Sequence, residues 1–252
     1  TTAGRNDILS ISTGSATISG TLTTGAGGCQ FTFTGTGTLT FGGATTVGLS
    51  TMTTVAGSTV KYSNAGTQTV IQGTYNNLTL AGSGAKTTTT VTVNGILSME
   101  GTATASAAPT YAAAATLQYN STHTAGAEWI TPFVASGGVI INTGTITLNA
   151  AKVFNATAPL TINSGATSAR STFLLTLNGN FINNGGTTSG SGGVTITGTG
   201  TQSIGSFTTT GTVSMTKTGG TATFTGNVNG GAFTLNGSGG TLDLGAGLTH
   251  TF

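Results

Sequence analysis

The sequence predicts an all-β fold, a right-handed parallel β-solenoid with about 20 residues per turn. The clearest sign is a repeat in the last third of the chain. One alternating apolar segment begins at Val194 and recurs at Val213 and Phe233. A second segment begins at Thr201 and recurs with the same period at Thr221 and Thr241. A short fixed period is typical of solenoids, in which each repeat buries its apolar row only against its neighbours.

The composition supports many short strands. The 252 residues include 61 Thr and 43 Gly but only 3 Pro, and 36% of the residues are hydrophobic. Thr is β-branched and suits a half-buried pleated surface. Glycine without proline or a triplet period excludes collagen, and the alternating aliphatic residues argue against disorder.

Strand-like alternation runs along the whole chain, and most segments end at Gly, Asn or Ser, which accept the backbone conformations of corners. Helical periodicity is nearly absent, since the best candidate, residues 112–117, is too short to predict a helix. The predicted strands are residues 8–12, 16–23, 30–34, 37–41, 59–62, 67–71, 77–80, 88–93, 96–99, 116–119, 139–141, 145–148, 160–162, 173–177, 194–196, 201–204, 213–215, 221–224, 233–235 and 241–244.

An antiparallel β-sandwich array is the alternative fold. Asn94-Gly95 and Asn178-Gly179 could form hairpin turns. The solenoid is favoured because the same two-strand unit repeats, and because a sandwich face exposed to water normally carries more charge than the 4% found here. We predict a single solenoid domain over residues 1–252, with an irregular insertion or broadened turns around residues 103–136.

The irregular stretch holds the only tryptophan of the chain. Trp129 lies close in sequence to Phe133, and Tyr119 precedes both. These three aromatic residues could fill a gap in the core. The sharper alternative is that they face a ligand, because aromatic side chains commonly line binding pockets.

Two segments resemble a known family of repeats. Residues 75–80 read YNNLTL and residues 82–87 read GSGAKT, within a repetitive stretch over 58–101. Residues 115–129 read ATLQYNSTHTAGAEW. The first stretch resembles the strand repeats of large secreted cell-surface proteins of Bacteroidota and related bacteria, and the second resembles their companion motif. The resemblance implies an extracellular or cell-surface location and an adhesin or surface fibre.

No constellation in the chain predicts catalysis. The four acidic residues are scattered without a shared register, so a pair of catalytic carboxylates is not expected. His123, His250 and the single Cys29 cannot supply an ordinary zinc site. We therefore expect no enzyme activity, no metal and no cofactor. The enzymatic alternative that remains is a polysaccharide-active β-helix.

Charge and hydropathy limit the partners. The six cationic residues are scattered, so no basic patch for nucleic acid is predicted. No apolar run approaches the length of a transmembrane helix. One cysteine excludes an intrachain disulfide, and we interpret the sequons at Asn77, Asn120 and Asn155 as chance occurrences. The absence of an initiator Met and of a signal peptide leads us to expect a mature or excised portion of a longer chain.

The two ends of the sequence look like strands without caps. Solenoids normally need polar caps, because terminal turns expose unpaired backbone and core. We therefore expect head-to-tail assembly of copies into an extracellular surface or matrix filament. The alternatives are an adhesin stalk that binds surface glycans and, less favoured, an ice-binding face, since Thr-x-Thr pairs do not recur at one constant spacing. The residues expected at the assembly ends are Ile8, Leu9, Ile11, Leu244, Leu248 and Phe252.

Overall fold

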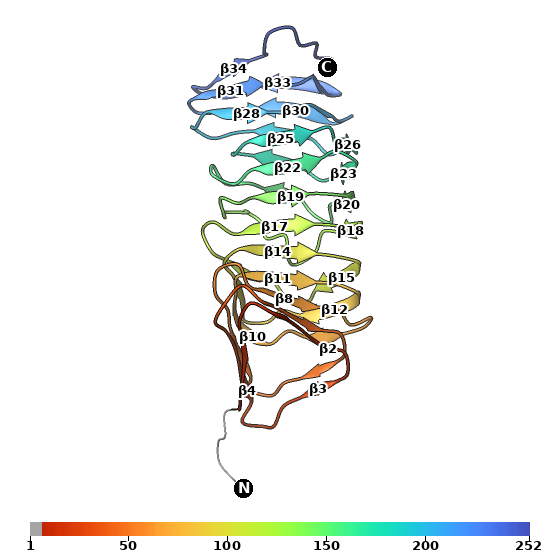
Figure 1. Ribbon diagram of the computed structural model, residues 1–252. Helices are drawn as coiled ribbons and strands as arrows, with labels where there is room; N and C mark the ends of the chain where they lie inside the picture. The colour runs from red at the N-terminus through yellow and green to blue at the C-terminus, as the bar shows by residue number, and fades with distance from the viewer. Residues whose placement is uncertain (1–6) are drawn as a thin grey trace. The chain divides into compact units, whose positions relative to one another are not determined.

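The computed structural model describes residues 7–252, and it is an all-β parallel β-solenoid (Figure 1). The coil makes about 11 turns of ~21 residues. Every described pairing between named strands is parallel, for example β1 (Asp7–Ile11) with β4 (Cys29–Phe33). The antiparallel sandwich alternative is therefore wrong. The chain forms two compact units: residues up to 118 with 126–128, and residues 119–125 with 129–252.

The first unit stacks its strands in three sets. The set that we call face A contains, in order, β1, β4, β7 (Thr51–Thr53), β10 (Gln72–Tyr75), β13 (Val91–Val93) and β16 (Thr110–Tyr111). Face B contains β2 (Ser15–Ile18), β5 (Thr38–Phe41), β8 (Thr59–Tyr62), β11 (Asn77–Leu80) and β14 (Ile96–Met99). The third set pairs β3 (Leu22–Thr23) with β6 (Thr45–Thr46), and β9 (Gln68–Thr69) with β12 (Ser83–Thr87) and β15 (Thr102–Ala105).

The second unit repeats this plan with shorter side stacks. Its longest stack is β19 (Val139–Ile141), β22 (Leu160–Asn163), β25 (Phe181–Asn184), β28 (Gln202–Ile204), β31 (Thr221–Phe224) and β34 (Thr241–Asp243). Another is β21 (Lys152–Val153), β24 (Leu175–Leu177), β27 (Val194–Ile196), β30 (Thr212–Met215) and β33 (Ala232–Leu235). The remaining strands are β18 (His123–Thr124), β20 (Gly144–Thr147), β23 (Ala166–Ala169) and β26 (Thr187–Ser189), and the pair β29 (Phe207–Thr208) and β32 (Val228–Asn229). The residue range of β17 (Thr116–Tyr119) falls in both units.

The register confirms the repeat that the sequence predicted. Val194 pairs with Val213, and Val213 pairs with Phe233. Elsewhere the turn length varies: the turn from Thr59 to its partner Asn77 is shorter than the turn from Ser15 to its partner Thr38. The strands keep their stacking because the corners between them absorb the difference.

The core consists of columns of apolar side chains, and each column takes one residue from the same register position of each successive turn. Leu39, Val60, Leu78 and Leu97 form one such column in the first unit, and each is fully buried. Burying a side chain of this size contributes about 1.5–3 kcal/mol. Because adjacent turns bury one another in this way, a turn without a neighbour on one side leaves its apolar row exposed.

Corners depend on glycine where turns approach most closely. Gly82 and Gly101 occupy equivalent corners of successive turns, and both have positive φ, +73° and +62°. A Cβ on Gly101 would collide with the carbonyl oxygen of Gly82, and a Cβ on Gly82 with that of Asn64. These two positions therefore require glycine for conformation and for space.

The stretch around residues 103–136 is partly regular. It contains the end of β15 and all of β16, β17 and β18. Residues 125–138 form no named strand, and among them only Phe133 makes a bridge, to Phe154. Residues 112–117 form a turn and the start of β17. The single-domain assignment over 1–252 stays a prediction. None of the described segments is a helix of the length and apolarity needed to cross a bilayer.

The strands that the sequence analysis missed are short and polar. They include β7, β12 and β23. Their sequences, TMT, SGAKT and ATSA, carry one or no large apolar residue, so alternation could not reveal them.

Candidate assembly surfaces

The outermost strands of the first unit present an apolar edge. Leu9 in β1 is 39% exposed, whereas Phe31, its partner one turn further in, is 3% exposed. Ile18 in β2 is half-buried, and its partner Phe41 is fully buried. A cavity of about 200 Å³ opens here, lined by Leu9, Ile18, Leu22, Phe31 and others.

Two of the predicted N-terminal assembly residues, Ile8 and Ile11, do not lie at the apolar edge as Leu9 does. Ile8 is 63% exposed and alternates with Leu9, so it lies on the outer side of the strand. Ile11 is already buried, because it pairs with Phe33 in the next turn and packs into the core. Of the three predicted residues, Leu9 is therefore the one that belongs to the apolar edge.

The last described turn of the second unit has the same character. Leu235 in β33 is 64% exposed, but its partner Met215 is 3% exposed. Leu244 and Phe252 are exposed as well, and Leu248 is half-buried. The ring of Phe252 packs on Phe233 at a centroid distance of 4.7 Å. All three predicted C-terminal residues thus lie at an apolar edge.

Side-chain hydrogen bonds fasten this last turn to the one before it. Asn227 Oδ1 accepts from the Thr249 amide, and Asn229 Oδ1 accepts from the Thr251 amide. His250 Nδ1 accepts from the Val228 amide, so the neutral imidazole carries its proton on Nε2 and donates it to the Leu244 carbonyl. His250 therefore has a structural role in the fold.

The aromatic residues predicted to face a ligand lie in the core instead. Tyr119 and Phe133 are fully buried, and Trp129 is 2% exposed. Trp129 packs on Tyr119 and Phe154 at centroid distances of 5.8 and 5.9 Å, and the ammonium of Lys152 lies over its ring. The physical reason is local: residues 125–138 supply no continuous strand, so large rings fill the space between turns.

Most of the cationic side chains that the structure describes are buried in the interior of the coil. Lys86 donates to the carbonyl oxygens of Asn64 and Gly66 at 2.7 and 3.0 Å. Lys217 donates to the Gly200 carbonyl and to Gln202 Oε1, each at 2.7 Å. Both side chains are fully buried, and burial lowers the pKa of each ammonium from its ordinary value.

Arg170 and Gln202 are also buried and donate to backbone carbonyl oxygens. Arg170 donates to the carbonyl oxygens of Gly192 and Thr208, and burial lowers the pKa of its guanidinium to about 10. The amide nitrogen of Gln202 donates to Leu177 and Gly179 in the preceding turn. These side chains supply further donors to backbone carbonyl oxygens near the corners, among them that of Leu177, which also accepts from the Thr197 amide.

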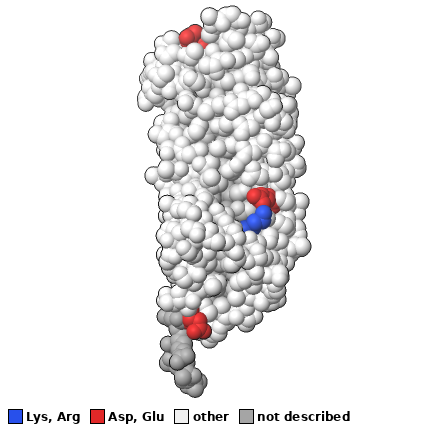
Figure 2. All heavy atoms as spheres, viewed as in Figure 1, with Lys and Arg blue, Asp and Glu red and all other residues white. Residues whose placement is uncertain are grey.

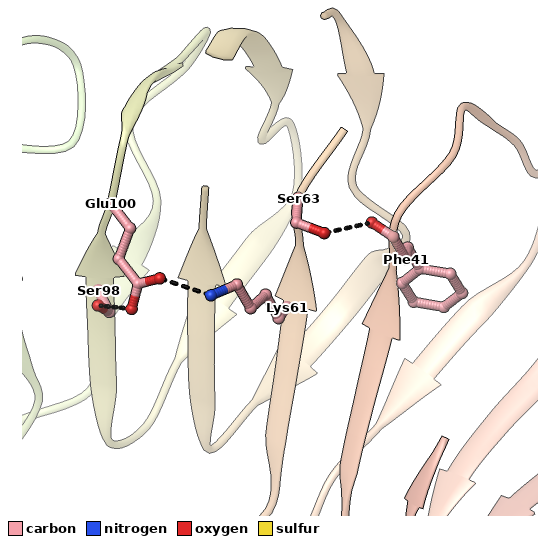
Figure 3. Close-up of polar contacts among 5 residues, drawn as sticks. All are labelled: Phe41, Lys61, Ser63, Ser98 and Glu100. Atoms are coloured by element: carbon pink, nitrogen blue, oxygen red, sulfur yellow. Dashed lines mark hydrogen bonds and ion pairs between the residues drawn. The ribbon is translucent and has the colours of Figure 1, made fainter. Parts of the chain in front are cut away.

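The surface is left almost without charge. Among residues 7–252, the charged side chains that are exposed or half-exposed are Asp7, Lys61, Glu100 and Asp243. Lys61 and Glu100 neutralise each other in an ion pair of 2.6 Å on face B, where Ser98 also donates to the carboxylate at 3.3 Å (Figure 3). Figure 2 shows one side of the molecule with only a few charged side chains, among them one cationic side chain against an acidic one.

The fourth acidic residue, Glu128, is buried, and its carboxylate accepts from the Gly126 amide at 2.7 Å. Within residues 7–252, no three His, Cys, Asp or Glu side chains lie close enough together to hold a metal ion. Cys29 is half-buried and lies at the apolar N-terminal edge.

Hydroxyl groups are aligned more regularly than the sequence indicated. On face A, successive strands place one hydroxyl each at the same register position. The sequence spacing between successive members becomes shorter along the chain, so a constant period in sequence was the wrong criterion; the corners change length while the strands stay in register. The column consists of Ser10, Thr32, Thr53, Thr74, Thr92 and Thr110.

Comparison with known proteins adds nothing to the fold. No protein-family model, no curated protein and no solved structure matches the chain.

Proposed function

We propose that this protein is a structural subunit whose copies stack end to end into a filament. The observation that carries the proposal is the pair of apolar edges described above. Each consists of inward-facing side chains that are exposed, while their partners one turn further in are buried. A second copy is the partner that matches both edges at once.

The two edges are complementary in register. On β34, Leu242 continues the inward row of Ala222, to which it pairs. On β2, Ala16 and Ile18 begin the inward row that continues through Leu39 and Phe41. Parallel pairing of β34 with β2 of the next copy sets Leu242 on Ala16 and Leu244 on Ile18.

The second strand of each edge fits the same stacking. Phe233 and Leu235 of β33 face inward, as do their buried partners Val213 and Met215. Leu9 of β1 faces inward at the other edge. Stacking β33 on β1 of the next copy therefore closes the core of the junction, and main-chain hydrogen bonds along the paired strand edges add to it.

The nearly neutral surface favours association. Few like charges oppose the approach of copies. In the proposed register Asp243 lies opposite Thr17, which is uncharged, on the outer side of the sheet. None of the β2 residues, Ser15–Ile18, carries a charge that would repel Asp243 in this register.

The proposed location rests on the motifs over residues 58–101 and 115–129. Their resemblance to repeats of secreted cell-surface proteins of Bacteroidota supports an exported protein at a bacterial surface. A filament of the surface or extracellular matrix is the form of structural protein that this location and the stacking edges favour. The burial of Trp129 removes the observation that had pointed to glycan binding.

Assembly is tested by light scattering and negative-stain electron microscopy over a concentration series. The wild-type chain is expected to form assemblies that lengthen with concentration. Leu235→Lys and Leu244→Lys place a charge in the junction and are expected to keep the protein monomeric. Leu174→Lys, at a residue 43% exposed and outside both edges, is the matched control and should assemble normally. A monomeric wild type at every concentration would refute the proposal.

Cysteine cross-linking tests the register. In a Cys29→Ser background, Asp243→Cys combined with Thr17→Cys is expected to give a ladder of disulfide-linked multimers on oxidation. Both side chains lie on the outer side of their strands, so the substitutions leave the core intact. Asp243→Cys combined with Thr59→Cys, in the inner strand β8, should give no ladder.

A further inference from the structure

The outer side of face A carries a feature that end-to-end stacking does not use. Its hydroxyl column, Ser10 to Thr110, takes one residue from each of six successive strands. Neighbouring members are separated by the distance between strands, about 4.8 Å. Ser10, Thr53, Thr74 and Thr110 are exposed, and the other two are half-buried.

The hydroxyls of this column are free to bind outside partners. Within residues 7–252, none of the six hydroxyl groups donates to or accepts from another residue. A comparable column in the second unit differs, since Thr234 donates to Ser214 at 2.9 Å. Thr54, next to the face A column, is also engaged, because it donates to the Thr74 carbonyl.

The side chains around the column define the chemistry of its partner. The adjacent outward positions are Gln30, Thr51 and Gln72, so the face carries no charge in the described strands β4, β7 and β10. The aromatic residues of the same strands, such as Phe31 and Tyr75, point into the core. A platform on which sugar rings could stack is therefore absent from these strands.

A rigid, periodic and uncharged array of hydroxyls suits a partner that is itself a lattice of oxygen atoms. The Thr side chains are stiff at χ1, so the array is ordered before binding and loses little entropy. The strand spacing is close to the oxygen repeat of hexagonal ice, and the Thr methyl groups offer apolar contacts between the hydroxyls. We propose that the outer side of face A binds the surface of ice.

The test is thermal hysteresis together with inhibition of ice recrystallisation, both measured on the wild-type chain. Thr53→Tyr places a ring in the middle of the column and is expected to abolish both effects. Thr53→Ser keeps the hydroxyl at small size and should retain part of the activity. Thr59→Tyr, on the outer side of face B, is the matched control and should behave as wild type. Circular dichroism verifies that each variant is folded.

Three results would overturn the proposal. They are a wild type without hysteresis, equal activity in Thr53→Tyr and wild type, and binding of the wild type to crystalline cellulose without an effect on ice. Monomeric Leu244→Lys separates this inference from filament assembly, because face A remains intact in that variant and its ice activity per molecule should persist at a reduced level or unchanged.

Discussion

Lysine has different surroundings in the interior of the second unit and on the outer side of face B. Lys217 is fully buried and donates to two acceptors in the coil. Lys61 is half-exposed and pairs only with Glu100. In the interior the ammonium donates to a backbone carbonyl and to a side-chain amide oxygen, whereas on the surface it makes an ion pair that water largely screens.

The comparison explains how a chain with ten charged residues can have an almost neutral surface. Lys86, Lys152, Arg170, Lys217 and Glu128 are all buried. Long cationic side chains can reach carbonyl oxygens at the corners of the coil, as Lys86 reaches Gly66 and Lys217 reaches Gly200. The charges thus stabilise the coil, and the surface that the structure describes is left with few charged side chains.

The largest effect is expected on removing an interior cation. Lys217→Met leaves the Gly200 carbonyl and Gln202 Oε1 buried without a donor, which costs about 3 kcal/mol of unfolding free energy. Urea unfolding monitored by circular dichroism measures the loss. Lys217→Arg, which keeps the donors, should lose less. A Met variant as stable as wild type would show that the ammonium is not needed in the interior.

An intermediate effect is expected in the asparagine ladder of the second unit. Asn163 donates to Asn142 at 2.7 Å and accepts from Asn184 at 2.9 Å, at a half-buried position. Asn163→Ala breaks both bonds and should cost about 1–2 kcal/mol. Hydrogen exchange should speed up at the amides of that corner. If protection stays unchanged, the ladder does not hold the turns together.

The smallest effect is expected at the surface pair. Lys61→Met should change the unfolding free energy by less than about 1 kcal/mol, because the pair is half-exposed. The difference between wild type and variant should shrink further in high salt. Glu100→Gln, tested in parallel, should behave alike. A loss as large as that of Lys217→Met would remove the distinction between interior and surface.

Sequence reasoning succeeded where the repeat was regular and apolar. The segments at Val194, Val213 and Phe233 align as their spacing predicted. It failed for β7 and β12, whose short polar strands are held by neighbouring turns and not by their own pattern. It also missed the hydroxyl column on face A, because the spacing between its members changes along the chain.

The residues predicted for the assembly ends differ in exposure, and their role in assembly stays a prediction. Leu9, Leu235 and Leu244 lie at apolar edges, although Leu235 was not among the residues singled out, and Ile11 proved to be buried. No sequence feature distinguished Lys217 from Lys61, since burial depends on where the corner of the turn falls. The ring of Trp129 could equally have been inside or outside until its neighbours Tyr119 and Phe154 were placed.

Composition and period by themselves determined that this chain winds into parallel coils, because alternating β-branched residues punctuated by glycine can bury an apolar row only against a similar turn. Tertiary structure alone decided which polar side chains face inward and which hydroxyls fall into line. Those outcomes depend on the lengths of the corners, which shift residues relative to one another in sequence while the backbone hydrogen bonds keep the strands in register.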